Sequence, residues 1–135
     1  PPVDLAAERR NGDFVRGLID ARRVDAVHDL SDGGLAVALA EMAMAGKVGA
    51  KIICDLGGAP HATLFGEDQG RYLLSADAAE AQKIVADAKA KGVPATIIGT
   101  TGGDALELPG EKPVAISALD KAHEGWLPAY MAGQA

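Results

Sequence analysis

The stretch Ala26–Leu35, AVHDLSDGGL, decides the fold of this chain because it joins a strand to a helix through a pair of glycines. A short apolar run enters a polar turn, which opens directly into an alanine-rich helix. Glycines let backbone N–H groups approach a ligand closely, and the unpaired amides of a helix N-terminus attract anions. The junction therefore predicts a phosphate site, whose polar side chains could also reach a sugar, a metal or an ammonium group. Its candidate residues are Asp29, Ser31, Asp32, Gly33 and Gly34.

The same turn also has a purely structural interpretation. Ser, Asp and Gly are common residues of helix N-caps, with or without a ligand. The spacing matches neither the G-x-G-x-x-G pattern nor a phosphate-binding loop. From the residues alone, both interpretations stay open.

A second polar cluster precedes a predicted strand at Phe65–Arg71, FGEDQGR. If this segment is extended, Glu67, Gln69 and Arg71 share one face, because side chains alternate along a strand. That face would offer an acceptor, an amide and a guanidinium to a ligand. The alternative is a structural ion pair between Glu67 and Arg71.

Residues 28–42, HDLSDGGLAVALAEM, and 64–72, LFGEDQGRY, resemble the last domain of the phosphoribosylformylglycinamidine synthase family. The flanks, from Pro2 to the closing helix with Trp126, extend this resemblance over nearly the whole chain. It implies that residues 1–135 are a single domain, the C-terminal fragment of a larger synthetase. The wider superfamily includes aminoimidazole ribonucleotide synthetase, selenophosphate synthetase and thiamine-phosphate kinase.

The resemblance implies a part of an ATP-dependent carbon–nitrogen ligase of purine biosynthesis, which converts formylglycinamide ribonucleotide to its amidine with glutamine-derived ammonia. ATP and Mg²⁺ are then cofactors of the full enzyme, and we expect no cofactor, metal or catalytic residue in this fragment, which is inactive alone. The implied partners are the other synthetase domains, a glutaminase, a small accessory subunit and the ribonucleotide substrate. In the family, residues 67–69 match a Glu-Ser-Gln motif near the substrate pocket, but Asp68 stands here in place of the serine.

Two alternatives to this function stay open. The chain could belong to another enzyme of the same superfamily. It could also be a non-catalytic interaction domain that completes a synthetase without binding a ligand. The family carries two copies of this domain type, so a substrate contact in one copy can be structural in the other.

The composition excludes several other classes of function. Thirteen basic against nineteen acidic side chains give a net charge of -6, which argues against partners such as nucleic acid or an anionic membrane. No apolar run reaches the length of a membrane helix, and the start PPVD is neither a signal peptide nor an initiator methionine, which favours a cytoplasmic fragment. The lone Cys54 excludes internal disulfides and fits core packing. The three histidines, at positions 28, 61 and 123, have no metal-ligand spacing.

The hydrophobic pattern predicts an α+β fold, an α/β sandwich. Its ferredoxin-like βαββαβ core gains a β-hairpin and a C-terminal helix, and the two core helices cover one face of a sheet. The expected helices are residues 4–23, 34–45, 78–91 and 119–131, and the expected strands are residues 26–28, 49–55, 71–75, 95–99, 106–108 and 114–116. Residues 56–67 are expected to form a long connection.

The helix from Leu35 to Met44 is apolar on almost every side, and Ile52-Ile53 adds a second apolar surface. Together they carry more hydrophobic surface than a two-layer domain covers. We therefore expect part of this surface to be exposed in the fragment and to cause weak self-association.

Overall fold

The computed structural model describes residues 3–53 and 59–133. Within these residues the chain forms five helices and six strands, which confirms the α+β class and the predicted order of the core, hairpin and C-terminal helix. The elements are α1 (Leu5–Asp20), β1 (Ala26–Asp29), α2 (Gly34–Gly46), β2 (Ala50–Ile52), α3 (Pro60–Phe65), β3 (Tyr72–Ser75), α4 (Ala78–Ala90), β4 (Gly99–Thr101), β5 (Ala105–Glu107), β6 (Val114–Ala115) and α5 (Ile116–Met131). No helix in this described part is long and apolar enough to cross a membrane.

Two compact units make up the chain. The first comprises residues 1–38 and 56–98, and the second comprises residues 39–55 and 99–135. The strands form two sheets instead of the predicted single sheet: β1 pairs with β3, and the other four follow the order β4-β2-β5-β6. Each sheet lies within one unit: β1 and β3 belong to the first unit, and the other four strands belong to the second. The assignment of residues 1–135 to a single domain stays a prediction.

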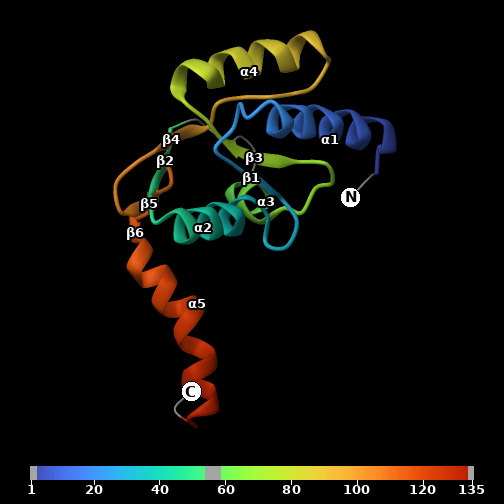
Figure 1. The fold of residues 1–135 in the computed structure, drawn as a ribbon. Coiled ribbons are helices and arrows are strands. Elements are labelled where there is room, and N and C mark those ends of the chain that lie inside the picture. The colour runs from blue at the N-terminus through green and yellow to red at the C-terminus, as the bar shows by residue number, and fades with distance from the viewer. Residues whose placement is uncertain (1–2, 54–58, 134–135) are drawn as a thin grey trace. The chain divides into compact units, whose positions relative to one another are not determined.

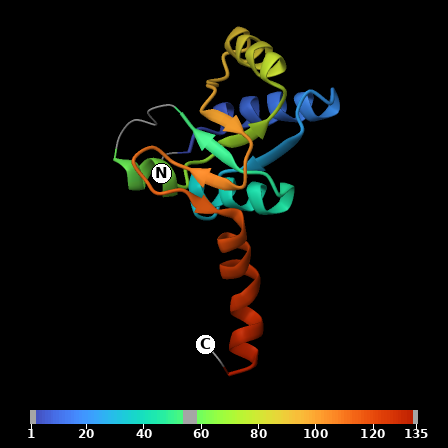
Figure 2. The ribbon, with the colours of Figure 1, turned by 90° about the vertical axis from the view of Figure 1, so that its left-hand side faces the viewer.

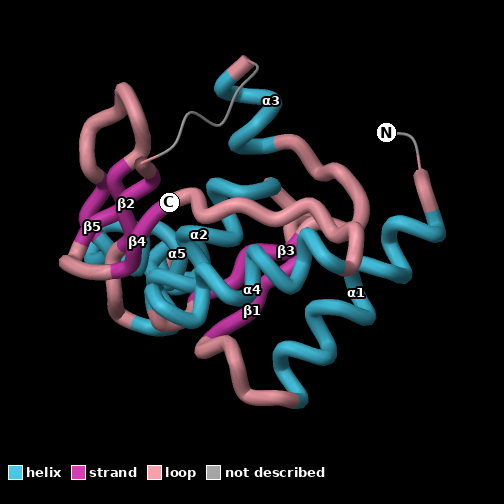
Figure 3. Tube along the Cα trace, turned by 90° about the horizontal axis from the view of Figure 1, so that it is seen from above, coloured by secondary structure: helices cyan, strands magenta, loops and turns pink. Residues whose placement is uncertain are grey.

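The first unit is built around the antiparallel β1–β3 ribbon, in which Ala26 pairs with Ser75 and Asp29 pairs with Tyr72. Helices α1 and α4 lie on one face of this ribbon (Figures 1 and 3). Helix α1 begins after Asp4, whose carboxylate accepts hydrogen bonds from the amides of Ala6 and Ala7 and so acts as an N-cap. The buried side chains of the two helices are Val15, Leu18, Ile84 and Ala88.

In the second unit, β2 lies between β4, which is antiparallel to it, and β5, which is parallel. Strands β5 and β6 form the predicted hairpin, with Leu106 opposite Val114. Helix α5 starts directly after β6 and leads away from the strands of its own unit (Figure 2). Its first residue is buried, whereas Trp126, Leu127, Tyr130 and Met131 are all exposed.

Several predicted boundaries differ from the structure. The expected long connection contains α3, because Pro60 stands at the first helical position, where its fixed φ favours a helix. The strand expected at residues 95–99 begins only at Gly99, where the backbone comes so close to β2 that a Cβ would lie 2.2 Å from the Lys51 carbonyl oxygen. Cys54 and the predicted strand end at residue 55 lie outside the described residues.

The expected exposure of apolar surface on α2 and at Ile52-Ile53 is found only in part. Leu35, Leu39 and Ile52 are buried, although Ile53 is 63% exposed. Val37, Met42 and Met44 on the same helix are half-buried. Four further large apolar residues are exposed on α5, namely Trp126, Leu127, Tyr130 and Met131.

Candidate functional site

Antiparallel pairing of β1 with β3 brings the two sequence motifs together. The chain leaves β1 at Asp29, opposite Tyr72 at the start of β3. One residue further on, the Leu30 amide donates to the Arg71 carbonyl oxygen at 3.0 Å. The turn that follows β1 therefore lies beside the segment that precedes β3.

These two segments line a cavity of about 300 Å³, which we call the polar cleft. Six of the eight predicted site residues line it, namely Asp29, Ser31, Asp32, Glu67, Gln69 and Arg71. Five carboxylates and a single guanidinium make its lining acidic. The other lining residues are Glu8, Leu30, Asp68, Gly70 and Tyr72.

Glu8 is the site residue that the motifs do not predict. It comes from α1, which packs so close to Gly70 that a Cβ there would lie 3.2 Å from the Glu8 Cα. The Asn11 side chain fixes this contact, because its amide donates to the Gly70 carbonyl oxygen at 3.1 Å. No local sequence pattern predicts that Glu8 lies beside Gly70, because this contact depends on the packing of a helix that is distant in the sequence.

The glycine pair is required by geometry. Gly33 and Gly34 have φ values of +76° and +65°, which L side chains rarely adopt. A Cβ at Gly34 would lie 2.7 Å from the Gly66 carbonyl oxygen and 2.8 Å from the Phe65 carbonyl carbon. The start of α2 thus touches the end of α3 through backbone alone.

Both amides of the predicted phosphate site already have acceptors in the structure. The Gly33 amide donates to Glu67 Oε1 at 2.9 Å, and the Gly34 amide donates to the Ser31 carbonyl oxygen at 3.2 Å. The Glu67 carboxylate therefore occupies the place beside the N-terminus of α2 where an anion is favoured. An external phosphate at these amides stays a prediction, and it requires Glu67 to move.

The predicted Glu67–Arg71 ion pair is wrong. Arg71 pairs with Asp68, with 3.3 Å between Nη1 and Oδ2, because the Glu67 carboxylate turns toward Gly33. Close by, His28 places Nδ1 2.6 Å from the Asp29 carbonyl oxygen. The guanidinium of Arg71 is the one cationic group that lines the polar cleft.

Arg23 and Glu80, whose pKa values are shifted, lie outside the polar cleft. Arg23 joins the end of α1 to α4. Its Nε is 2.5 Å from Glu80 Oε1, and its Nη1 is 2.8 Å from Asp87 Oδ2. The hydrogen bond from Arg23, aided by one from Lys83, lowers the pKa of the Glu80 carboxyl. The same contact with Glu80 raises the pKa of Arg23. This network holds two helices together, which makes it structural.

The polar cleft has the chemistry of a polar ligand site. Carboxylates accept hydrogen bonds from sugar hydroxyls or ammonium groups, and a guanidinium binds phosphate or carboxylate. In residues 3–53 and 59–133, no three His, Cys, Asp or Glu side chains are grouped so that they could hold a metal ion. The cleft thus favours hydroxyl and cationic groups over a bare anion.

Comparison with known proteins finds relatives that match the whole length of this chain. The phosphoribosylformylglycinamidine synthase subunit PurL of Parvibaculum lavamentivorans is 57% identical over 135 residues, which cover 100% of this chain and 18% of that protein. The chain thus spans less than a fifth of the length of that relative.

Two solved structures share the fold. T. maritima PurL complexed with FGAR matches with a TM-score of 0.73 at 18% identity, covering 87% of this chain and 21% of that chain. T. maritima PurL complexed with ATP matches with a TM-score of 0.68 at 16% identity, covering 82% and 21%. The family model described as AIR synthase related protein, C-terminal domain, matches residues 1–108. Since that match covers most of the sequence, the chain belongs to the AIR synthase related protein C-terminal domain family.

Proposed function

We propose that this chain serves as the C-terminal domain of a phosphoribosylformylglycinamidine synthase. The observation that carries the proposal is the 57% identity to such a synthase subunit over the whole chain. The proposed activity of the complete enzyme is the ATP-dependent conversion of formylglycinamide ribonucleotide and ammonia to the amidine, ADP and phosphate. Its proposed partners are a glutaminase and a small accessory subunit, and its proposed location is the cytoplasm.

The proposed role of the polar cleft is to hold the sugar phosphate part of a ribonucleotide. Asp29 and Asp32 would accept hydrogen bonds from ribose hydroxyls, since ionised carboxylates only accept. Arg71 would release Asp68 and bind a phosphate oxygen. The support for this role is the convergence of six predicted residues on one cavity.

Glu67 would control access of phosphate to the turn. Its carboxylate holds the Gly33 amide, which an incoming phosphate would need. Two anions cannot share this amide, because their repulsion is strong at such short range. Binding would therefore require the Glu67 carboxylate to rotate away from the Gly33 amide.

We propose that Mg²⁺ and most contacts to ATP belong to the rest of the enzyme. The described residues offer no group of three ligating side chains, so they do not fit a magnesium site. The solved structure of T. maritima PurL with ATP contains a chain of which this fold covers 21%. ATP supplies the phosphoryl group that activates the amide oxygen, and this chain would help to position the substrate.

The occupied amides of Gly33 and Gly34 favour a second candidate, a domain that completes the synthetase without binding a ligand. In that case the Glu67 contact is a helix cap and nothing more. A phosphate titration separates the two roles. We expect ribose 5-phosphate to shift the backbone amide NMR signals of Gly33 and Gly34, whereas a pure packing domain would show no shift.

Two variants sharpen this titration. Glu67→Ala frees the Gly33 amide and removes one carboxylate, so ribose 5-phosphate should bind more tightly. Glu8→Ala is the matched control, because it removes a carboxylate from the same cleft and leaves both the Gly33 contact and the Arg71–Asp68 pair intact. Equal gains in the two variants would show that cleft charge, and not the amide, determines binding.

A chimera tests the function itself. This chain replaces the matching 18% of the Parvibaculum lavamentivorans subunit, and amidine formation is measured with ammonia, ATP and the ribonucleotide. We expect the chimera to stay active, while the same subunit without this segment and the 135-residue chain alone are inactive. A folded chimera without turnover would contradict the proposal, and turnover by the chain alone would contradict the assignment of catalysis to other domains.

A further inference from the structure

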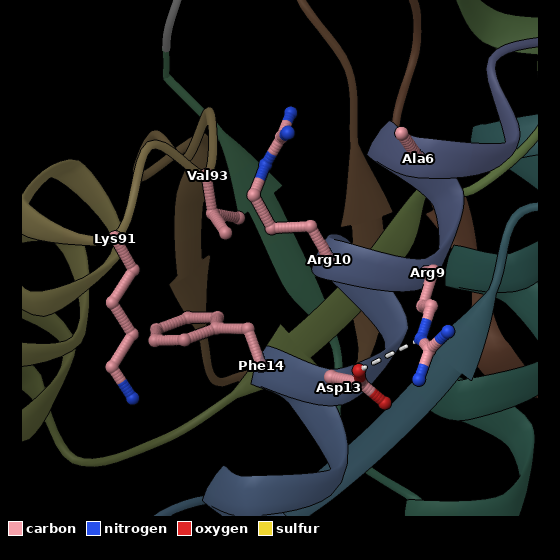
Figure 4. A pocket seen from close by; sticks show the side chains of 7 residues that line it. All are labelled: Ala6, Arg9, Arg10, Asp13, Phe14, Lys91 and Val93. Carbon is pink, nitrogen blue, oxygen red and sulfur yellow. Dashed lines mark ion pairs between the residues drawn. The ribbon is translucent and has the colours of Figure 1, made fainter.

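A second cavity, of about 480 Å³, lies within the first unit between α1 and the segment that follows α4. We call it the basic cleft. Figure 4 shows its lining residues, which are Ala6, Arg9, Arg10, Asp13, Phe14, Lys91 and Val93. None of them lines the polar cleft, and neither sequence motif includes them.

The charge of the basic cleft is opposite to that of the whole chain. The sequence has a net charge of -6, yet this cleft is lined by three cations and a single carboxylate. That carboxylate, Asp13, is already engaged, because it pairs with Arg9 at 3.7 Å and also with Arg16. Arg10 and Lys91 have no ion-pair partner anywhere in residues 3–53 and 59–133.

The cleft also has an apolar surface. Phe14 is half-buried, and Val93 is 7% exposed. Lys91 holds its Nζ 5.5 Å from the centre of the Phe14 ring, a cation–π contact. In Figure 4, Phe14 and Val93 lie between Lys91 on one side and Arg10 on the other.

We propose that the basic cleft binds an aromatic phosphate monoester. The charged ends of Arg10 and Lys91 point in opposite directions in Figure 4, so both of these long, flexible side chains would rotate to join one phosphate. The aromatic group would pack on Phe14 and Val93, which offer it apolar contact. A ligand with a dianionic phosphate matches two cations without ion-pair partners better than a ligand with a single carboxylate group, which carries only one negative charge. The volume also falls within the usual range for small-molecule sites, about 300–1,000 Å³.

The basic cleft is separate from the proposed ribonucleotide site. Arg9 and Arg10 on α1 line the basic cleft and not the polar cleft, to which α1 contributes only Glu8. Binding here therefore does not depend on the function proposed above. It also needs neither glycine amide of the turn.

NMR titration of the ¹⁵N-labelled 135-residue chain tests the proposal with three probes: phenyl phosphate, inorganic phosphate and phenol. We expect phenyl phosphate to shift the amides of Phe14 and of residues 91–93 saturably. Because it uses both the cations and the apolar surface, it should bind at least about fivefold more tightly than either fragment. Inorganic phosphate that binds as tightly as phenyl phosphate would overturn the aromatic part, and the absence of saturable shifts at these residues would overturn the site.

Three variants complete the test. Arg10→Gln should weaken phenyl phosphate binding about fivefold or more, through the loss of a charge-assisted contact. Arg22→Gln is the matched control, because it removes the same charge just after α1, at an exposed residue that neither lines the cleft nor pairs with Asp13. Phe14→Leu should weaken phenyl phosphate and leave inorganic phosphate unchanged. Equal effects of Arg10→Gln and Arg22→Gln would reduce the site to general surface charge and so refute it, and Arg10 and Arg22 are exposed enough for both variants to fold.

Discussion

We expect Gly34→Ala to destabilise the chain far more than its small size suggests. The residue has φ +65°, and its Cα faces the backbone at the end of α3 without any side chain between. An added Cβ would lie 2.7 Å from the Gly66 oxygen and 2.8 Å from the Phe65 carbonyl carbon. Backbone cannot rotate aside as a long side chain can, so the two segments must separate.

Two contributions set the magnitude. A left-handed backbone costs an L residue about 1–2 kcal/mol. Forcing an extra carbon into a close contact costs about 1–3 kcal/mol more. The free energy of unfolding should thus fall by about 2–5 kcal/mol, and with a urea slope of about 1.5 kcal/mol per molar, the midpoint should fall by about 1–3 M.

Gly92→Ala is the matched control for this experiment. Gly92 has φ +67°, almost the same as Gly34, but an added Cβ there meets nothing within 4 Å. Gly92→Ala should therefore lose only the backbone contribution, about 1–2 kcal/mol. Urea unfolding followed by circular dichroism measures both variants. Equal midpoints for Gly34→Ala and Gly92→Ala would refute the close approach between the turn and α3.

Three further predictions concern the packing, the charges and α5. Leu18 is 2% exposed, so Leu18→Ala should lower the free energy of unfolding by about 2–4 kcal/mol. Ile19 is 49% exposed, so Ile19→Ala should lower it by less than about 1 kcal/mol. Similar urea midpoints for the two variants would contradict the described core. The lowered pKa of Glu80 means that its pairing with Arg23 stabilises the chain fully above the unfolded-state pKa and is lost as the pH falls through the folded-state pKa. Thermal unfolding of Arg23→Gln should thus differ from the parent most at neutral pH and least in acid, and a gap that is constant with pH would oppose this. Trp126, the single tryptophan of the sequence, is 60% exposed and stacked on Tyr130. Iodide should therefore quench its fluorescence readily, and Trp126→Ala should lower the free energy of unfolding by about 0.5 kcal/mol or less. Strong protection from iodide would show that α5 is covered.

The sequence by itself determined both motifs and most of the local elements, but not α3 or the start of β4. Gly33 and Gly34 predict a tight turn because only glycine tolerates their backbone conformation, and the structure confirms that turn. The helical spacing of apolar residues predicts α1 and α4 closely, because each of these helices buries one face. The same spacing predicts α5, although only Ile116 of that helix is buried. The hairpin of β5 with β6 follows from two short strands separated by turn residues.

Only the tertiary structure decided how the strands pair and which charges meet. The antiparallel register of β1 with β3 brings the two motifs together, and no residue within either motif specifies that partner. Glu67 binds the Gly33 amide instead of Arg71 because the end of α3 aims it there. Glu8 joins the polar cleft through the packing of α1 against Gly70.

The exposed apolar surface shows the same limit. We expected the apolar helix α2 to leave part of its surface exposed in the fragment, yet Leu35 and Leu39 are buried, and the exposed aromatic residues are Phe65 at the end of α3 and Trp126 and Tyr130 on α5. Hydrophobicity along a sequence tells which residues gain free energy from burial, but not which neighbours are near enough to cover them. Local conformational preference acts within a few residues and can be predicted from the sequence. Burial and charge pairing depend on segments that are distant in the chain, so they are settled only when the whole chain packs.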